Sequence, residues 1–134
     1  MHPVKLLDEN QAIALVHGTT EASCKRGNIV IIGRGGQGIF KDKPGVLHVR
    51  IEAPLDIRVK RIQDQENVGP TAAQEMATQR DKAAADYLMR FYDIDWADPM
   101  LYDLAINTGK LGVDAAAHLI VNAVGYLPPT ESSG

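Results

Sequence analysis

Hydrophobic and polar positions divide the chain into short strand-like and helix-like segments. Residues 29–32, Ile-Val-Ile-Ile, form an unbroken apolar run, which predicts a strand covered on both faces. In Val46–Glu52 apolar and polar positions alternate, which predicts a strand with one solvated face. A third short strand is expected at Tyr102–Asn107.

Helical spacing of apolar residues predicts four longer helices, at about residues 8–25, 55–66, 72–92 and 113–124. The helix over 72–92 has few apolar side chains before Tyr87, so we expect it to project partly from the core. The last helix carries a stripe that should face the core, made of Val113, Ala116, Ala117, Ile120, Val121 and Val124. The alternation of helices and strands predicts an α/β fold with a parallel sheet.

The length of 134 residues fits one domain, which we place at residues 1–127, with 128–134 as a disordered tail. The net charge of −3 provides no global field that would favour a nucleic acid partner. No apolar run is long enough for a membrane span, and the single cysteine excludes an internal disulfide framework. The expected location is therefore cytoplasmic. The four histidines lack ligand-like spacing, so no metal site is predicted.

The glycine-rich segment after the first predicted strand is the first candidate site. Gly33, Arg34 and Gly35 would place backbone amides and a guanidinium at the carboxyl edge of a parallel sheet, where such folds bind ligands. With Gly38 these glycines also fit the dinucleotide pattern G-x-G-x-x-G. However, Pro44 stops the following helix after about two turns, which is too short for a dinucleotide fold, so this class stays a minor alternative. A purely structural role, close packing of a helix on a strand, is the other alternative.

Longer motifs occur in a consistent order along the chain. They are VIIGRG at residues 30–35, VRIEAPLDIRVKRI at 49–62, RDKAAADYLMRFYDIDWADP at 80–99 and YDLAINTGKLGVDAAAHLI at 102–120. Together they resemble the cytidylate kinase-like family of P-loop nucleoside monophosphate kinases, over most of residues 10–124. The resemblance implies a three-layer α/β fold, a parallel sheet between flanking helices, with a lid-like helical segment at about residues 67–98.

The resemblance also implies roles for individual residues. Arg34 would touch the nucleotide acceptor, Arg58 and Arg61 would lie at the base of the lid, and polar side chains of the lid itself would approach the phosphates. The lid residues are Arg80, Asp81 and Arg90, and Asn107 and Thr108 match the loop near the adenine. Arginine forks suit this reaction because phosphoryl transfer needs positive charge around the phosphate oxygens. ATP and magnesium are the expected cofactors of the family.

The sequence departs from the family in one large respect. It contains no G-x-x-x-x-G-K-[ST], so the phosphate cradle, its lysine and the magnesium-binding hydroxyl are missing. Ala84 also stands where another lid arginine is expected. Both departures argue against autonomous kinase activity.

In P-loop kinases the strand before this loop lies between those matched by Ile29–Gly33 and Val46–Glu52. Its absence leaves three possibilities: the two strands close up, a second copy or a partner chain completes the sheet, or the sequence is a fragment of a longer protein. Two functional hypotheses therefore remain. One is an incomplete phosphotransferase, and the other is a non-catalytic nucleotide-binding or scaffold protein.

Overall fold

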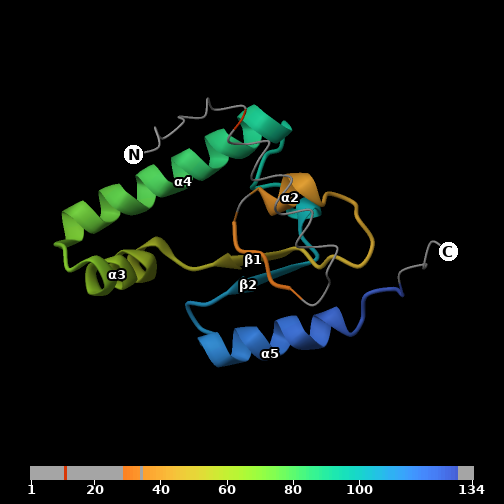
Figure 1. Ribbon diagram of the computed structural model, residues 1–134. Coiled ribbons are helices and arrows are strands. Elements are labelled where there is room, and N and C mark those ends of the chain that lie inside the picture. The colour runs from red at the N-terminus through yellow and green to blue at the C-terminus, as the bar shows by residue number, and fades with distance from the viewer. Residues whose placement is uncertain (1–10, 12–28, 34, 130–134) are drawn as a thin grey trace, which may run out of the picture. The chain divides into compact units, whose positions relative to one another are not determined.

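The computed structural model describes residues 11, 29–33 and 35–129 of the 134-residue chain. It divides into two units, Met1–Lys41 and Asp42–Gly134. The predicted helix at about residues 8–25 lies almost wholly outside the described residues. Among the described residues, the sheet and the longer helices belong to the second unit (Figure 1).

In the first unit the glycine-rich segment makes a tight turn followed by α2, Gly36–Ile39. Gly33 and Gly35 have φ angles of 71° and 70°, in the left-handed region that side chains disfavour. The Gly36 amide donates to the Gly33 carbonyl at 3.2 Å, and the Ile39 amide donates to the Gly35 carbonyl at 3.0 Å. The helix predicted here is therefore shorter than expected, a single turn.

Residues 29–32 form no strand, so the prediction of a strand covered on both faces is wrong. Val30 and Ile32 are 88% and 87% exposed. An apolar β-branched run becomes a strand only when a neighbour accepts and donates its ladder hydrogen bonds. No described strand pairs with residues 29–32. The composition of these residues favours a strand, but it does not provide the neighbouring strand.

The second unit contains a parallel pair of strands, β1 (Val49–Glu52) and β2 (Leu104–Asn107). Val49 is in register with Leu104 and Glu52 with Asn107. Backbone hydrogen bonds continue past both ends, from the Asp103 amide to the His48 carbonyl (2.8 Å) and from the Thr108 amide to the Glu52 carbonyl (2.7 Å). The α/β class with parallel pairing is confirmed. The sheet comprises two strands among the described residues, one fewer than the sequence predicted.

The three α-helices of the second unit begin and end close to their predicted limits, whereas the short 3-10 helix was not predicted. They are α3 (Leu55–Glu66), α4 (Pro70–Tyr92), the 3-10 helix η1 (Pro99–Leu101) and α5 (Val113–Val124). Asn67 and Asp93 terminate α3 and α4 in the left-handed conformation, with φ angles of 54° and 53°. Among the described helices, none combines the length and apolar character that crossing a bilayer requires.

The α3–α4 helical hairpin has its own small core. Ile62 from α3 packs with Ala73 and Ala77 of α4, and both alanines are completely buried. Because alanine has only a methyl side chain, the two helix backbones can approach closely at these positions. This packing fixes the first half of α4 against α3.

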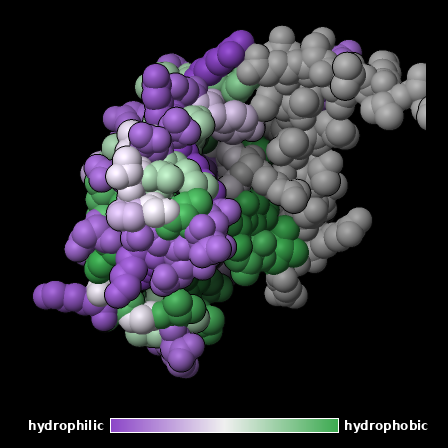
Figure 2. Space-filling model, turned by 90° about the vertical axis from the view of Figure 1, so that its left-hand side faces the viewer, coloured by the Kyte–Doolittle hydropathy of each residue, from purple (hydrophilic) through white to green (hydrophobic). Residues whose placement is uncertain are grey.

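Helix α5 packs against β2, and α4 and α5 lie on opposite sides of the sheet (Figure 1). Ala116 is buried, as the apolar stripe predicted, but Val113 and Val121 are 79% and 71% exposed. The prediction that the whole stripe faces a core is therefore wrong, because a two-stranded sheet is too narrow to cover it. Apolar residues also reach the surface between hydrophilic ones on the face seen in Figure 2.

Candidate functional site

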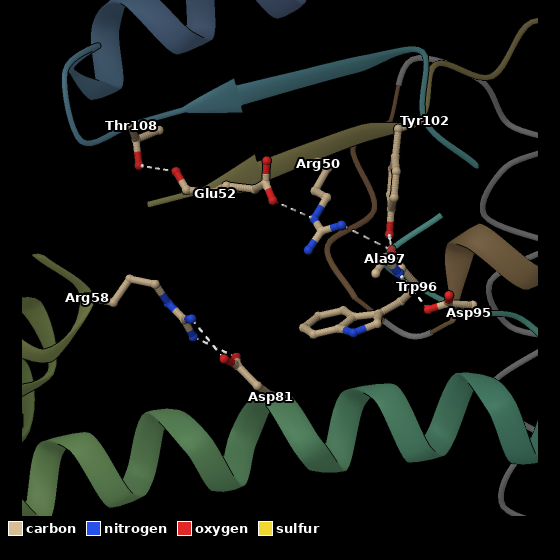
Figure 3. Close-up of polar contacts among 9 residues, drawn as sticks. All are labelled: Arg50, Glu52, Arg58, Asp81, Asp95, Trp96, Ala97, Tyr102 and Thr108. Atoms are coloured by element: carbon tan, nitrogen blue, oxygen red, sulfur yellow. Dashed lines mark hydrogen bonds and ion pairs between the residues drawn. The ribbon is translucent and has the colours of Figure 1, made fainter. Parts of the chain in front are cut away.

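Arg58 on α3 and Asp81 on α4 form a bidentate ion pair (Figure 3). Arg58 Nη1 donates to Asp81 Oδ2 at 2.8 Å, and Nη2 donates to Oδ1 at 2.6 Å. The hydrogen bonds to Asp81 raise the pKa of Arg58, burial lowers it in part, and the charge of Asp81 raises it further. The two side chains are 33% and 37% exposed, so the pair is partly open to solvent.

Arg61, one turn further along α3, binds the loop that follows β2. Its Nη1 donates to Thr108 Oγ1 and its Nη2 to the Thr108 carbonyl, both at 3.0 Å. Thr108 Oγ1 in turn donates to the Glu52 carbonyl at 3.1 Å. This chain of bonds ties α3 to the carboxyl ends of both strands, where parallel sheets bind ligands.

Asn107 shapes the same loop, since its Oδ1 accepts a hydrogen bond from the Gly109 amide at 2.8 Å. A Cβ on Gly109 would lie 2.8 Å from Pro54 Cδ and 3.1 Å from Ile57 Cδ1. The loop after β2 is therefore packed tightly against the start of α3.

The remaining predicted lid residues, Arg80 and Arg90, also lie on α4. Arg80 forms an exposed ion pair with Glu66 at 3.2 Å, and the Arg90 guanidinium lies over the Phe91 ring at 5.2 Å. Both arginines are exposed at the helix surface.

The structure thus brings four predicted residues into two contacting pairs, Arg58 with Asp81 and Arg61 with Thr108. Gly33 and Gly35 belong to the first unit, and Arg34 lies outside the described residues.

Comparison with known proteins identifies the family of this arrangement. Residues 7–110 match the model of the family described as "Cytidylate kinase-like family". The chain belongs to this family.

The cytidylate kinase-like chain has named relatives in archaea. A cytidylate kinase from Thermococcus kodakarensis is 30% identical over 112 residues, which cover 84% of this chain and 57% of the relative. Cytidylate kinases from Natronomonas pharaonis and Halobacterium salinarum are 33% and 31% identical, over 63% and 58% of this chain and 44% and 41% of their own lengths. The chain therefore spans about half the length of these curated relatives.

A solved structure has a similar fold. The crystal structure of an uncharacterized protein from Eubacterium ventriosum superposes with a TM-score of 0.73 at 27% identity. The match covers 87% of this chain and 64% of that protein. It supports the fold and adds no functional assignment.

The kinase-like chain does not present a magnesium site in its described part. No group of three or more His, Cys, Asp or Glu side chains gathers there in a way that would hold a metal ion. The sequence also has no P-loop hydroxyl that would contribute a ligand. The described residues therefore offer no magnesium site of their own, and an ion in a kinase of this family would be held by substrate phosphates and the P-loop.

Sequence reasoning missed the contacts of Arg50. This β1 residue forms an ion pair with Glu52 at 3.2 Å and lies over the rings of Trp96 and Tyr102. The alternation in Val46–Glu52 placed Arg50 and Glu52 on one polar face. It gave no signal for the two aromatic residues, which lie more than 40 positions further along the chain.

Proposed function

We propose that this chain is the lid-bearing part of a nucleoside monophosphate kinase, an enzyme that transfers the γ-phosphoryl group of ATP to a nucleoside monophosphate. Membership of the family and the relatives named cytidylate kinase support this class of reaction. The observation that carries the proposal is the accessible guanidinium fork of Arg58, held between α3 and α4.

Arg58 suits a phosphate ligand in three respects. The guanidinium is charged at every physiological pH, its two parallel N–H groups match two phosphate oxygens, and a third of the side chain is exposed. Asp81 accepts from one N–H of each Nη, and a guanidinium has five N–H groups, so a phosphate can bind the three that Asp81 does not use while the ion pair is kept. Binding therefore requires little reorganisation of Arg58.

We infer that phosphoryl transfer requires a P-loop from outside these residues, since the sequence contains none. In the three-layer family fold, the strand before that loop would lie beside the second edge of β1. Among the described residues only β2 pairs with β1, which leaves this edge for a strand of a second copy, of a partner chain or of a longer form of the protein.

The test is isothermal titration of the chain with CMP and, separately, with ATP and magnesium. We expect CMP to bind without turnover and ATP to bind weakly at best. Arg58→Ala should weaken CMP binding by about tenfold or more, because it removes two charge-assisted hydrogen bonds.

Lys60→Ala is the matched control. Lys60 lies on α3, is exposed, and has no assigned role, so its replacement removes one positive charge from the same helix. An equal loss of affinity in the two variants would assign the effect to net charge and contradict the proposed contact.

The second candidate is a non-catalytic scaffold. The specific observation in its favour is that Arg58, Arg61 and Arg80 already have partners within the chain. Absence of CMP binding, together with retained folding by circular dichroism, would favour this candidate over the first.

A further inference from the structure

Arg50 on β1 contacts the segment between α4 and β2 through its side chain. Its guanidinium carbon lies 5.4 Å from the centroid of the Trp96 ring and 5.7 Å from that of Tyr102. Figure 3 shows the side chain reaching from β1 to the turn that carries Trp96. Both distances are within the range of a cation–π contact.

The main chain of this turn takes part in the same arrangement. The Trp96 carbonyl accepts a hydrogen bond from Tyr102 Oη at 2.7 Å and a longer one from Arg50 Nη1 at 3.4 Å. On its other side, Arg50 Nε pairs with Glu52 at 3.2 Å. The guanidinium therefore contacts two rings, a carbonyl and a carboxylate, and we call the set Arg50, Glu52, Trp96 and Tyr102 the Arg50 clamp.

The turn itself is locally ordered. Asp95 Oδ1 accepts a hydrogen bond from the Ala97 amide at 3.0 Å, Asp98 Oδ1 accepts one from the Met100 amide at 2.9 Å, and Ile94 is buried. The turn can therefore link the position of Trp96 to the position of the carboxyl end of α4. If Arg50 fixes Trp96, it also fixes the carboxyl end of α4, which ends at Tyr92.

We propose that Arg50 is a positioning residue that fixes the carboxyl end of the lid helix α4 through Trp96. Helix α4 has a first attachment in its amino-terminal half, where Ala73, Ala77 and Asp81 contact α3. The Arg50 clamp is the second. Asp81 lies about 17 Å from the helix end at Tyr92, at 1.5 Å per residue, so a rotation of the rigid helix released at that end displaces the Arg58–Asp81 pair. The effect on nucleotide affinity rests on the proposed function, whereas the attachment itself does not.

The geometry requires arginine in particular. A planar, delocalised guanidinium can contact two aromatic rings and still donate hydrogen bonds in its own plane. A lysine ammonium is a compact, strongly hydrated charge, which could keep the ion pair with Glu52 but not this stacking. Arg50→Lys therefore keeps the positive charge and removes the planar guanidinium, so it tests the two properties separately.

The test uses hydrogen exchange and intrinsic fluorescence of the full chain, in which Trp96 is the only tryptophan. We compare Arg50→Lys and Arg50→Met with the control Lys60→Met, which removes an exposed charge from α3. Both Arg50 variants should shift the Trp96 emission to longer wavelength and accelerate amide exchange of residues 93–102 by about tenfold, as expected from the loss of two cation–π contacts. Lys60→Met should do neither. If Arg50→Lys shows the same amide exchange of residues 93–102 and the same Trp96 emission as the wild type, the proposal is overturned.

A second variant covers the case in which the Arg50 variants fail to fold. Trp96→Leu keeps Arg50 and Glu52 but removes one ring, and it should accelerate exchange of the same residues. Unchanged exchange in Trp96→Leu would also overturn the proposal.

CMP titration of Arg50→Lys then tests the link to the site. We expect CMP affinity to fall severalfold while the circular dichroism of the variant stays that of the wild type. If segment 93–102 loosens and CMP affinity is unchanged, the positioning role is overturned. If wild-type chain binds no CMP, the proposed function fails, and the exchange of residues 93–102 alone decides whether Arg50 fixes the helix end.

Discussion

Gly109 occupies a position with no room for a side chain. A Cβ would lie 2.8 Å from Pro54 Cδ, at the start of α3, and 2.9 Å from Asn107 Oδ1, at the end of β2. We predict that Gly109→Ala lowers the free energy of unfolding by about 1–3 kcal/mol, because the backbone must move to admit the methyl group. Denaturant unfolding measures this loss.

Gly112→Ala is the matched control in the same loop. No atom lies within 4 Å of the Cβ that alanine would add there. Gly112 is the N-cap of α5, where the cost of alanine and the gain from a stiffer unfolded chain nearly cancel, so we expect little net change in stability. Equal destabilisation by the two variants would show that Gly109 is not constrained by contact.

Tyr92 gives a prediction for alkaline pH. Burial raises the pKa of its phenol above the usual value of 10.0, and the neighbouring Tyr87 raises it further. Since the folded pKa exceeds the unfolded one, this group's contribution to stability is complete below pH 10 and is lost as pH rises through the folded pKa.

An absorbance titration of tyrosinate should therefore contain a late phase that Tyr92→Phe removes. Tyr126→Phe, at a position 88% exposed, is the control and should leave the late phase in place. A late phase that survives in Tyr92→Phe would contradict the assignment.

At the scale of elements, the α3–α4 hairpin depends on two small residues. Ala73 and Ala77 are fully buried against Ile62, so a larger side chain would push the helices apart. We predict that Ala77→Leu destabilises the protein by about 1–3 kcal/mol. Ala83→Leu, on the exposed surface of α4, should change stability by less than about 0.5 kcal/mol. The comparison of the two unfolding midpoints is the measurement.

The elements that sequence predicted well are those whose causes are local. Helix α3 follows Pro54, carries apolar residues at helical spacing and ends in a turn, so its bounds could be read directly. The strand prediction for residues 29–32 was wrong because a strand requires a hydrogen-bonded neighbour, whatever its composition. The Arg50 clamp was missed for the same reason: its members meet only after β1 and the turn following α4 come together.

The candidate site was predictable in its residue types and not in its pairings. The family resemblance singled out Arg58, Asp81 and Thr108 as nucleotide contacts. The structure adds that Arg58 binds Asp81 and that Arg61 binds Thr108, contacts that depend on how α3 and α4 pack. Spacing along one helix carries no information about such contacts between helices.

At the scale of the whole molecule, the edge of β1 that pairs with no described strand predicts association. A two-stranded parallel sheet is marginal by itself, and Ile51 on β1 is 52% exposed. We expect the chain to form a concentration-dependent dimer or larger species in sedimentation velocity experiments.

Ile51→Lys should reduce this association, since a charge on an exposed strand disfavours further pairing. Val121→Lys is the comparison variant, because Val121 on α5 is 71% exposed but lies outside the sheet. A monomer at all concentrations would contradict the prediction. An equal reduction of association by Ile51→Lys and Val121→Lys would show that the copies do not meet at the strand edge.

The long crossover connection between β1 and β2 also separates the synthesis of the two strands in time. His48 and Asp103, which hydrogen-bond at the start of the sheet, are 55 residues apart, and the whole α3–α4 hairpin lies between them. At the usual speed of translation, β1 leaves the ribosome roughly 3 to 11 seconds before its partner strand exists. The helical hairpin can fold within that interval, whereas β1 must wait with its backbone groups unpaired by β2.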